Sequence, residues 1–121
     1  MKLEELKVFN LSIDLGERIW QVVQQWDYFS KETIGKQIVR SADSIAANIS
    51  EGYGRFHYKE NVNFSYYSRG SLSETRTWLL KAHKRNLLKV SDFEEISIII
   101  DDLTVRLNNY IKSPGKHPMS T

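Results

Sequence analysis

Cysteine is absent from the chain of 121 residues. Its absence excludes disulfides, thiolate nucleophiles, and zinc or iron–sulfur centres held by cysteine. No apolar run approaches the roughly 18–20 residues that are needed to span a bilayer. The first residues, MKLEE, lack the apolar segment of a signal peptide. We therefore predict a cytoplasmic protein.

Proline occurs only at Pro114 and Pro118, so no proline interrupts a helix before the last residues. Strand-like alternation is scarce, whereas apolar residues recur at steps of three and four. This spacing predicts helices at about 3–26, 31–53, 58–86 and 92–111. Short connections favour antiparallel neighbours, so the predicted fold is all-α, an antiparallel up-down-up-down four-helix bundle over residues 1–112. Residues 113–121 are predicted to form a flexible C-terminal tail.

The same spacing predicts which side chains face inward and where helices begin and end. Ser30 and Ser91 are predicted N-caps, and Gly52 and Gly54 bracket a helix stop. Trp20 and Trp78 adjoin further apolar residues, which predicts a second buried surface and self-association. The inward residues of the first helix should be Leu6, Phe9, Ile13, Gly16, Ile19 or Trp20, Val23 and Trp26. Those of the second should be Ile34, Ile38, Ser41 or Ala42, Ile45, Asn48 or Ile49, and Gly52. Those of the third should be Val62 or Phe64, Tyr67, Ser71, Glu74 or Thr75, Trp78 and Ala82, with Leu72 and Leu79 widening the face. Those of the fourth should be Phe93, Ile96, Ile99 or Ile100, Leu103, Leu107, and Tyr110 or Ile111.

Polar residues on the inward face of the second helix form the densest group of unusual residues in the sequence. A buried polar group without a partner costs about 1–3 kcal/mol, so such residues need partners on a neighbouring helix. We predict a buried network between the second and third helices that fixes their register. The alternative is a pocket whose two carboxylates, Glu51 and Glu74, do acid–base work. The predicted members are Arg40, Ser44, Asn48, Glu51, Ser71 and Glu74.

Known signatures of metal and nucleotide sites are missing. Di-metal helical bundles use Glu-x-x-His on two helices, but none of His57, His83 and His117 follows a glutamate by three residues. The segment IGKQ at 34–37 lacks the upstream glycine and the following Ser or Thr of a phosphate-binding loop. The sequence predicts no metal, no cofactor and no small-molecule substrate.

Positive charge is concentrated in the middle of the chain. Residues 55–89 contain eight Lys or Arg and two Glu, a net charge of +6, whereas the remainder has nine and thirteen, a net charge of −4. Interleaved aromatics, including Tyr53, Phe56, Tyr58, Tyr66 and Tyr67, add stacking surfaces of the kind used with looped or single-stranded RNA. The same charge could instead keep the helix solvated or pair with another subunit. The candidate nucleic-acid-binding residues are Arg55, Lys59, Arg69, Arg76, Lys81, Lys84 and Arg85.

Two segments carry a resemblance to a known family. Residues 37–55 read QIVRSADSIAANISEGYGR, and residues 70–74 read GSLSE, followed by Thr77, Leu79 and Ala82. From about Leu6 to Ile111 the chain resembles the bacterial four-helix-bundle proteins encoded in intervening sequences of 23S ribosomal RNA genes, also labelled S23 ribosomal proteins. One departure is Tyr28-Phe29-Ser30, where the family usually has Phe-Pro. The resemblance implies a bundle that assembles into homo-oligomers, typically ring-like pentamers, and it implies no catalysis.

The sequence leaves three functions open. The leading prediction is a non-enzymatic homo-oligomer, with a pentamer favoured, that binds RNA or a nucleic-acid-handling protein through its basic third helix. The alternative is a structural or interaction scaffold without nucleic-acid binding. An enzyme that uses Glu51 and Glu74 comes third.

Overall fold

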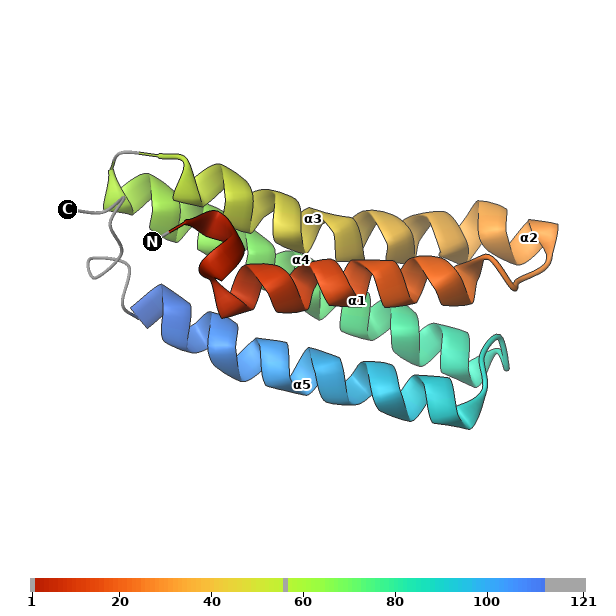
Figure 1. The fold of residues 1–121 in the computed structure, drawn as a ribbon. Coiled ribbons are helices and arrows are strands. Elements are labelled where there is room, and N and C mark those ends of the chain that lie inside the picture. The colour runs from red at the N-terminus through yellow and green to blue at the C-terminus, as the bar shows by residue number, and fades with distance from the viewer. Residues whose placement is uncertain (1, 56, 113–121) are drawn as a thin grey trace.

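The computed structural model describes residues 2–55 and 57–112. Within these residues all regular structure is helical and none forms a strand. Four long helical segments dominate, as predicted (Figure 1). The predicted tail at 113–121 and Phe56 lie outside the described residues. The elements are a 3-10 turn η1 (Leu3–Glu5), α1 (Lys7–Val23), α2 (Tyr28–Ser30), a π-helical turn η2 (Lys31–Gly35), α3 (Lys36–Tyr53), α4 (Tyr58–Lys84) and α5 (Val90–Lys112).

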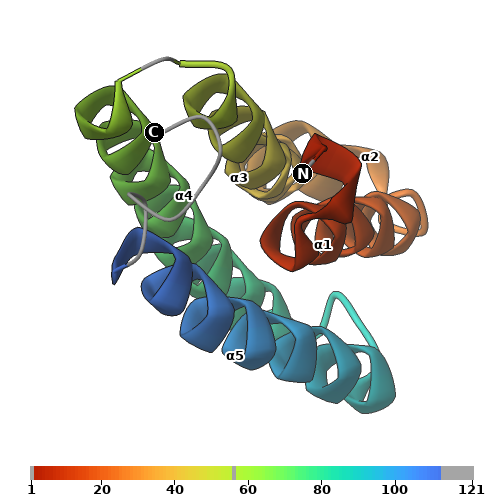
Figure 2. The ribbon, with the colours of Figure 1, turned by 60° about the vertical axis from the view of Figure 1, so that its left-hand side comes forward.

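The four long helices pack around a shared core, consistent with a bundle. Each of them contacts two neighbours: α1 lies against α3 and α5, and α4 lies against the same two helices (Figures 1 and 2). Hydrogen bonds between α4 and α5 show how this pair is aligned. Arg69 bonds to Asn108 (3.2 Å) and Arg76 to Asp101 (2.8 Å), so earlier residues of α4 lie against later residues of α5. The end of α1, the start of α3, the end of α4 and the start of α5 all lie at one end of the molecule (Figure 1).

The predicted core faces of α3 and α5 are confirmed. Buried side chains recur at helical spacing along both helices, including Ile38 and Ile45 on α3 and Ile100 and Leu107 on α5. Apolar residues dominate these faces, so hydrophobic periodicity identifies them directly. Burial of each such side chain contributes about 1.5–3 kcal/mol, which makes these faces a major source of stability.

The core face predicted for α1 is confirmed in part. The predicted Leu6, Gly16, Val23 and Trp26 are buried, and so is Ile19, the alternative to Trp20. Ser12 and Leu15 are also buried, whereas Ile13 and Trp20 are 41% and 51% exposed. The helix carries two apolar stripes at helical spacing, and the sequence alone does not show which one faces the core. The stripe that contains Ile13 and Trp20 faces solvent in the monomer.

The core face predicted for α4 is also confirmed only in part. The predicted Leu72, Leu79 and Ala82 are buried, and so is Thr75, the alternative to Glu74. Tyr67 and Glu74 are exposed, and the prediction missed three buried polar residues, Asn61, Ser65 and Ser68. Hydrophobic periodicity misses such residues because half of this core face is polar.

The helix boundaries differ from the prediction at two N-termini. Asp27, not Ser30, caps the segment that begins at Tyr28, and its carboxylate accepts a hydrogen bond from the Ser30 N–H (3.3 Å). Ser91 is not an N-cap, because α5 begins one residue before it. The stop predicted at Gly52–Gly54 is confirmed, since α3 ends at Tyr53. After α4, Asn86 adopts a positive φ of 58° and the Leu87 N–H bonds to the Ala82 carbonyl (3.0 Å), a left-handed termination that asparagine tolerates.

Candidate nucleic-acid interface and polar helix contacts

The six residues of the predicted polar network do not form a buried cluster. Arg40, Glu51 and Glu74 are exposed, and Ser44, Asn48 and Ser71 are half-buried. Four hydrogen bonds or ion pairs that engage them are local, each joining residues four positions apart in the sequence. They join Ser44 to the Arg40 carbonyl (2.8 Å), Asn48 to the Ser44 carbonyl (2.9 Å), Glu51 to Arg55 (2.5 Å) and Glu74 to the Trp78 indole (3.2 Å).

Other residues make the polar contacts between α3 and α4. The Thr75 hydroxyl lies 2.8 Å from the Ser41 hydroxyl and also 2.8 Å from the Ser71 carbonyl, so it donates its proton to one of them at a time. The Ser68 hydroxyl donates to the Ile45 carbonyl across the helix pair (2.9 Å). All three hydroxyl-bearing residues, Ser41, Ser68 and Thr75, are buried. The sequence signal that could have identified them is the spacing of small polar residues on α4 at 61, 65, 68 and 75.

The candidate carboxylate pair, Glu51 and Glu74, is separated along the bundle. Thr75 lies level with Ser41, and Glu51 is ten residues further along α3. At about 1.5 Å per residue, the two carboxylates are therefore roughly 15 Å apart along the helix axis. A general acid and base must both reach one substrate at hydrogen-bonding distance. This arrangement does not support joint acid–base chemistry.

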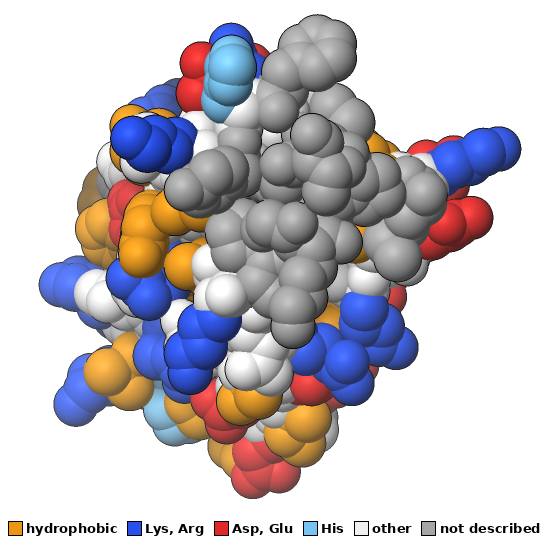
Figure 3. Space-filling view, turned by 90° about the vertical axis from the view of Figure 1, so that its left-hand side faces the viewer, with side chains coloured by type: hydrophobic (Ala, Val, Ile, Leu, Met, Phe, Trp, Pro, Cys, Tyr) orange, Lys and Arg blue, Asp and Glu red, His pale blue; other side chains and the backbone are white. Residues whose placement is uncertain are grey.

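The candidate cations at the start of α4 are engaged by nearby acids. Arg55 forms an ion pair with Glu51 and lies 4.0 Å from the Glu60 carboxylate, and its guanidinium sits over the Phe64 ring. Lys59 is exposed. Figure 3 views this end of the bundle, where Lys and Arg side chains are interspersed with acidic and hydrophobic ones. The start of α4 is therefore not a surface of one charge.

The two candidate arginines in the middle of α4 hold α5. Arg76 forms an ion pair with Asp101 (2.8 Å). Arg69 bonds to Asn108 and lies over the Tyr66 ring, 4.7 Å from its centre. These contacts occupy some of the N–H donors of Arg69 and Arg76. Both side chains are therefore less available to bind a ligand.

The candidate cations at the end of α4 are different. Lys81, Lys84 and Arg85 are exposed, and none forms an ion pair with another described residue. Lys81 lies over the Trp78 ring, 6.0 Å from its centre. Lys59 and Lys84 are roughly 40 Å apart along the helix at about 1.5 Å per residue. The seven predicted residues thus form three separate groups, of which the group at the end of α4 has the least internal neutralisation.

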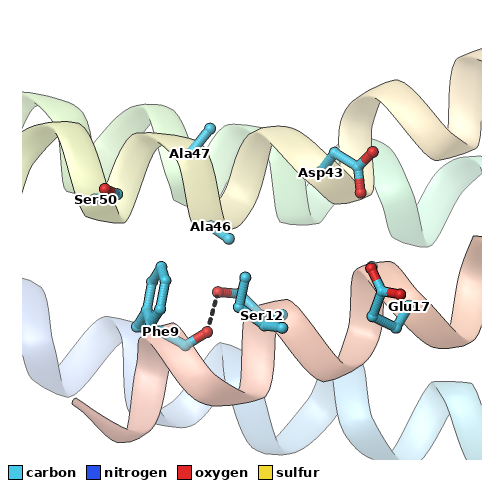
Figure 4. A pocket seen from close by; sticks show the side chains of 9 residues that line it. Phe9, Ser12, Glu17, Asp43, Ala46, Ala47 and Ser50 are labelled. Atoms are coloured by element: carbon cyan, nitrogen blue, oxygen red, sulfur yellow. Dashed lines mark hydrogen bonds between the residues drawn. The ribbon is translucent and has the colours of Figure 1, made fainter. Parts of the chain in front are cut away.

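A pocket that the sequence did not indicate lies between α1 and α3. Its volume is about 380 Å³, and Glu17 on α1 faces Asp43 on α3 across it (Figure 4). Partial burial, with repulsion from Glu17, raises the pKa of the Asp43 carboxyl above its ordinary value. Gly16 admits this carboxylate, because a Cβ at that position would lie 3.0 Å from Asp43 Oδ1. No histidine or positive side chain lines the pocket, so we assign it no chemistry.

The four packed helices, with polar contacts that join helices and no assembled catalytic group among the candidates, define a helical-bundle protein. The sequence pattern of the 23S rRNA-intervening sequence proteins matches residues 4–109, and the chain belongs to this family. The family predicted from the sequence is confirmed. No curated protein matches the chain.

A solved structure shares this fold. It is a protein of unknown function from the S23 ribosomal protein family of Bacteroides thetaiotaomicron VPI-5482, 23% identical in sequence, with a TM-score of 0.78. The match covers 88% of this chain and 99% of that one. No helix in residues 2–55 and 57–112 has both the length and the apolar character that crossing a bilayer requires. In the same residues, no group of three or more acidic or histidine side chains is placed to hold a metal ion.

Proposed function

We propose that this chain is a non-enzymatic, homo-oligomeric bundle protein that binds RNA through the exposed cations at the end of α4. The observation that carries this proposal is the contrast along α4. Arg69 and Arg76 are engaged by α5, whereas Lys84 and Arg85 form no ion pair within the described residues. Unpaired lysine and arginine side chains attract phosphates and release counterions on binding.

The proposed arrangement of the bundle is the antiparallel up-down-up-down order. It is supported by hydrogen bonds that pair the earlier part of α4 with the later part of α5. On the α1 side, Arg18 near the end of α1 forms ion pairs with Asp92 (2.7 Å) and Glu95 (3.1 Å) near the start of α5. The pairs α4–α5 and α1–α5 therefore each bring the end of one helix next to the start of α5, as the proposed antiparallel order requires.

Self-association is part of the proposal, and a ring-like pentamer is the form that the family resemblance favours. Its support in the structure is an apolar stripe on the outer face of α5. Ile98 and Val105 are 68% and 61% exposed and lie two helical turns apart. Apolar stripes of this kind are commonly covered in an assembly. A protein that sedimented as a monomer at micromolar concentration would contradict this part.

The alternative is a scaffold that binds no nucleic acid. It is favoured by the ion pair of Arg76 with Asp101 and the hydrogen bond of Arg69 to Asn108, because these contacts give the middle of α4 a structural role. The first function predicts RNA binding that weakens with salt, and the scaffold predicts no RNA binding. Each phosphate contact steepens the fall of log K with log salt by about 0.9 for a duplex or 0.7 for a single strand.

The test is a salt titration of binding to a structured RNA. Lys84→Glu combined with Arg85→Glu should weaken binding and make its salt dependence shallower. Lys7→Glu combined with Lys112→Glu, two exposed lysines at the other end of the bundle, is the matched control and should have little effect. Tight binding that ignores both salt and the double reversal would contradict the proposal, and absence of RNA binding would favour the scaffold.

A further inference from the structure

A second groove runs between the end of α1 and the start of α3, next to the acidic pocket. Its volume is about 440 Å³, within the range of about 300–1,000 Å³ that is typical of ligand pockets. One wall includes the π-helical turn η2, and such turns in helices are frequent at functional sites. The groove is lined by Trp20, Val23, Gln24, Lys31, Glu32, Gly35, Lys36, Val39 and Arg40.

Trp20 supplies an exposed aromatic face in this groove. Its side chain is 51% exposed, while the adjacent Ile19 and the nearby Val23 are buried and anchor the helix to the core. A tryptophan that the core does not need, held on a rigid helix, is a suitable platform for stacking a nucleobase. The other two tryptophans are less accessible, since Trp26 is buried and Trp78 is half-buried.

Basic side chains line the same groove as Trp20. Lys31, Lys36 and Arg40 line the groove with a single acid, Glu32, which pairs with Lys36 (2.7 Å). The charges of the groove therefore sum to +2. In the neighbouring pocket, Glu17 and Asp43 lie about one helical turn from Trp20 and Arg40, so a phosphate is favoured at the other end of the groove, beside Lys31 and Lys36.

We propose that this groove binds single-stranded RNA, with one base stacked on Trp20 and the adjoining phosphates paired with Lys31, Lys36 and Arg40. A single strand is required because bases in a duplex are stacked on each other and cannot cover the indole. A second copy of this chain fits the groove less well, since lysines are depleted from the centres of protein interfaces. The groove uses none of the cations on α4, so it extends the proposed RNA binding to a separate site.

The experiment follows tryptophan fluorescence during titration with a short single-stranded oligouridylate. The variant Trp78→Phe leaves Trp20 as the accessible indole, and its emission should be quenched as the oligonucleotide binds. Trp20→Phe combined with Trp78→Phe should show no such quenching, and Trp20→Ala should lower the affinity by about ten-fold, in line with the stacking contributions of aromatic residues. Lys36→Glu together with Arg40→Glu should also lower it. Lys7→Glu together with Lys112→Glu, the same charge change at exposed positions at the other end of the bundle, is the matched control.

Two outcomes would overturn the inference. One is an unquenched Trp20 signal in Trp78→Phe at oligouridylate concentrations that saturate binding of the wild type. The other is a groove already covered by a second copy, which would show as blue-shifted Trp20 emission without RNA and a smaller particle on Trp20→Ala. The reversal of Lys84 and Arg85 separates this site from the one on α4. If that reversal leaves RNA affinity intact while Trp20 is still quenched, the α4 proposal fails and the groove stands.

Discussion

Helices α3 and α4 approach each other closely at Gly52. Replacement by alanine should therefore destabilise the protein at Gly52, whereas the same substitution at Gly70 should stabilise it. A Cβ at Gly52 would lie 2.8 Å from Asn61 Oδ1, 2.9 Å from Phe64 Cβ and 3.2 Å from the Asn61 carbonyl oxygen. Non-bonded heavy atoms prefer separations of about 3.5–4.0 Å, so α4 would have to move. A Cβ at Gly70, which is exposed in the middle of α4, meets nothing within 4 Å.

The magnitudes follow from two opposing terms. Alanine is favoured over glycine inside a helix by about 1 kcal/mol, and less in the last turn where Gly52 lies. Overpacking costs about 1–3 kcal/mol, and Phe64 Cβ and the Asn61 carbonyl move only with the α4 backbone. We therefore expect Gly52→Ala to lower the free energy of unfolding by about 1–2 kcal/mol. Gly70→Ala should raise it by about 1 kcal/mol.

The assay is urea unfolding followed by far-ultraviolet circular dichroism. Both variants are compared with the wild type at one fixed protein concentration, because association makes apparent stability concentration-dependent. A gap of about 2–3 kcal/mol between the variants corresponds to roughly 10 °C in Tm for a chain of this size. If Gly52→Ala were as stabilising as Gly70→Ala, the close approach of α3 and α4 would be wrong.

Two further predictions concern single polar groups. Thr75→Val should lower the free energy of unfolding by about 1 kcal/mol, because it removes the buried bond to Ser41, whereas Thr77→Val on the exposed face of α4 should change it little in the same urea assay. Asp43→Asn should stabilise the protein at neutral pH, because burial and Glu17 raise the pKa of Asp43 in the folded state above the unfolded value of 3.8. The folded protein then binds a proton before the unfolded chain does, so wild-type stability should rise as pH falls through this window and the gap to Asp43→Asn should close. If the difference in free energy of unfolding between the wild type and Asp43→Asn grew as the pH fell, the inferred upward shift of the Asp43 pKa would be wrong.

Hydrophobic periodicity predicted the number of helices and the core faces of α3 and α5, because in those helices apolar residues and burial coincide. On α4 it missed Asn61, Ser65 and Ser68, which are as buried as Leu72. Ser68 is satisfied in the core by the Ile45 carbonyl on α3, and such a partner is a property of the packed structure. The bond between Thr75 and Ser41 joins positions 34 residues apart, beyond the reach of any local pattern.

The candidate interface shows a related limit. Composition located the basic segment, but it did not show which cations were already paired. Arg76 and Lys84 look equivalent in the sequence, yet one forms an ion pair with Asp101 and the other forms none within the described residues. The Trp20 groove was missed for another reason. It is built from two helices and depends on which of two apolar stripes on α1 turns outward.

The π-helical turn at Lys31–Gly35 has a consequence for how the length of this chain can vary. Each residue of an α-helix advances about 100°, so the wider turn holds about one residue more than an α-turn without changing the phase of the later residues. Loss of one residue between Lys31 and Gly35 would close an ordinary α-turn there and would leave Ile38 and Ile45 facing the core. The same deletion elsewhere in the helix would rotate every later side chain away from its partner on α4. Relatives of different length are therefore expected to place their gap at this turn.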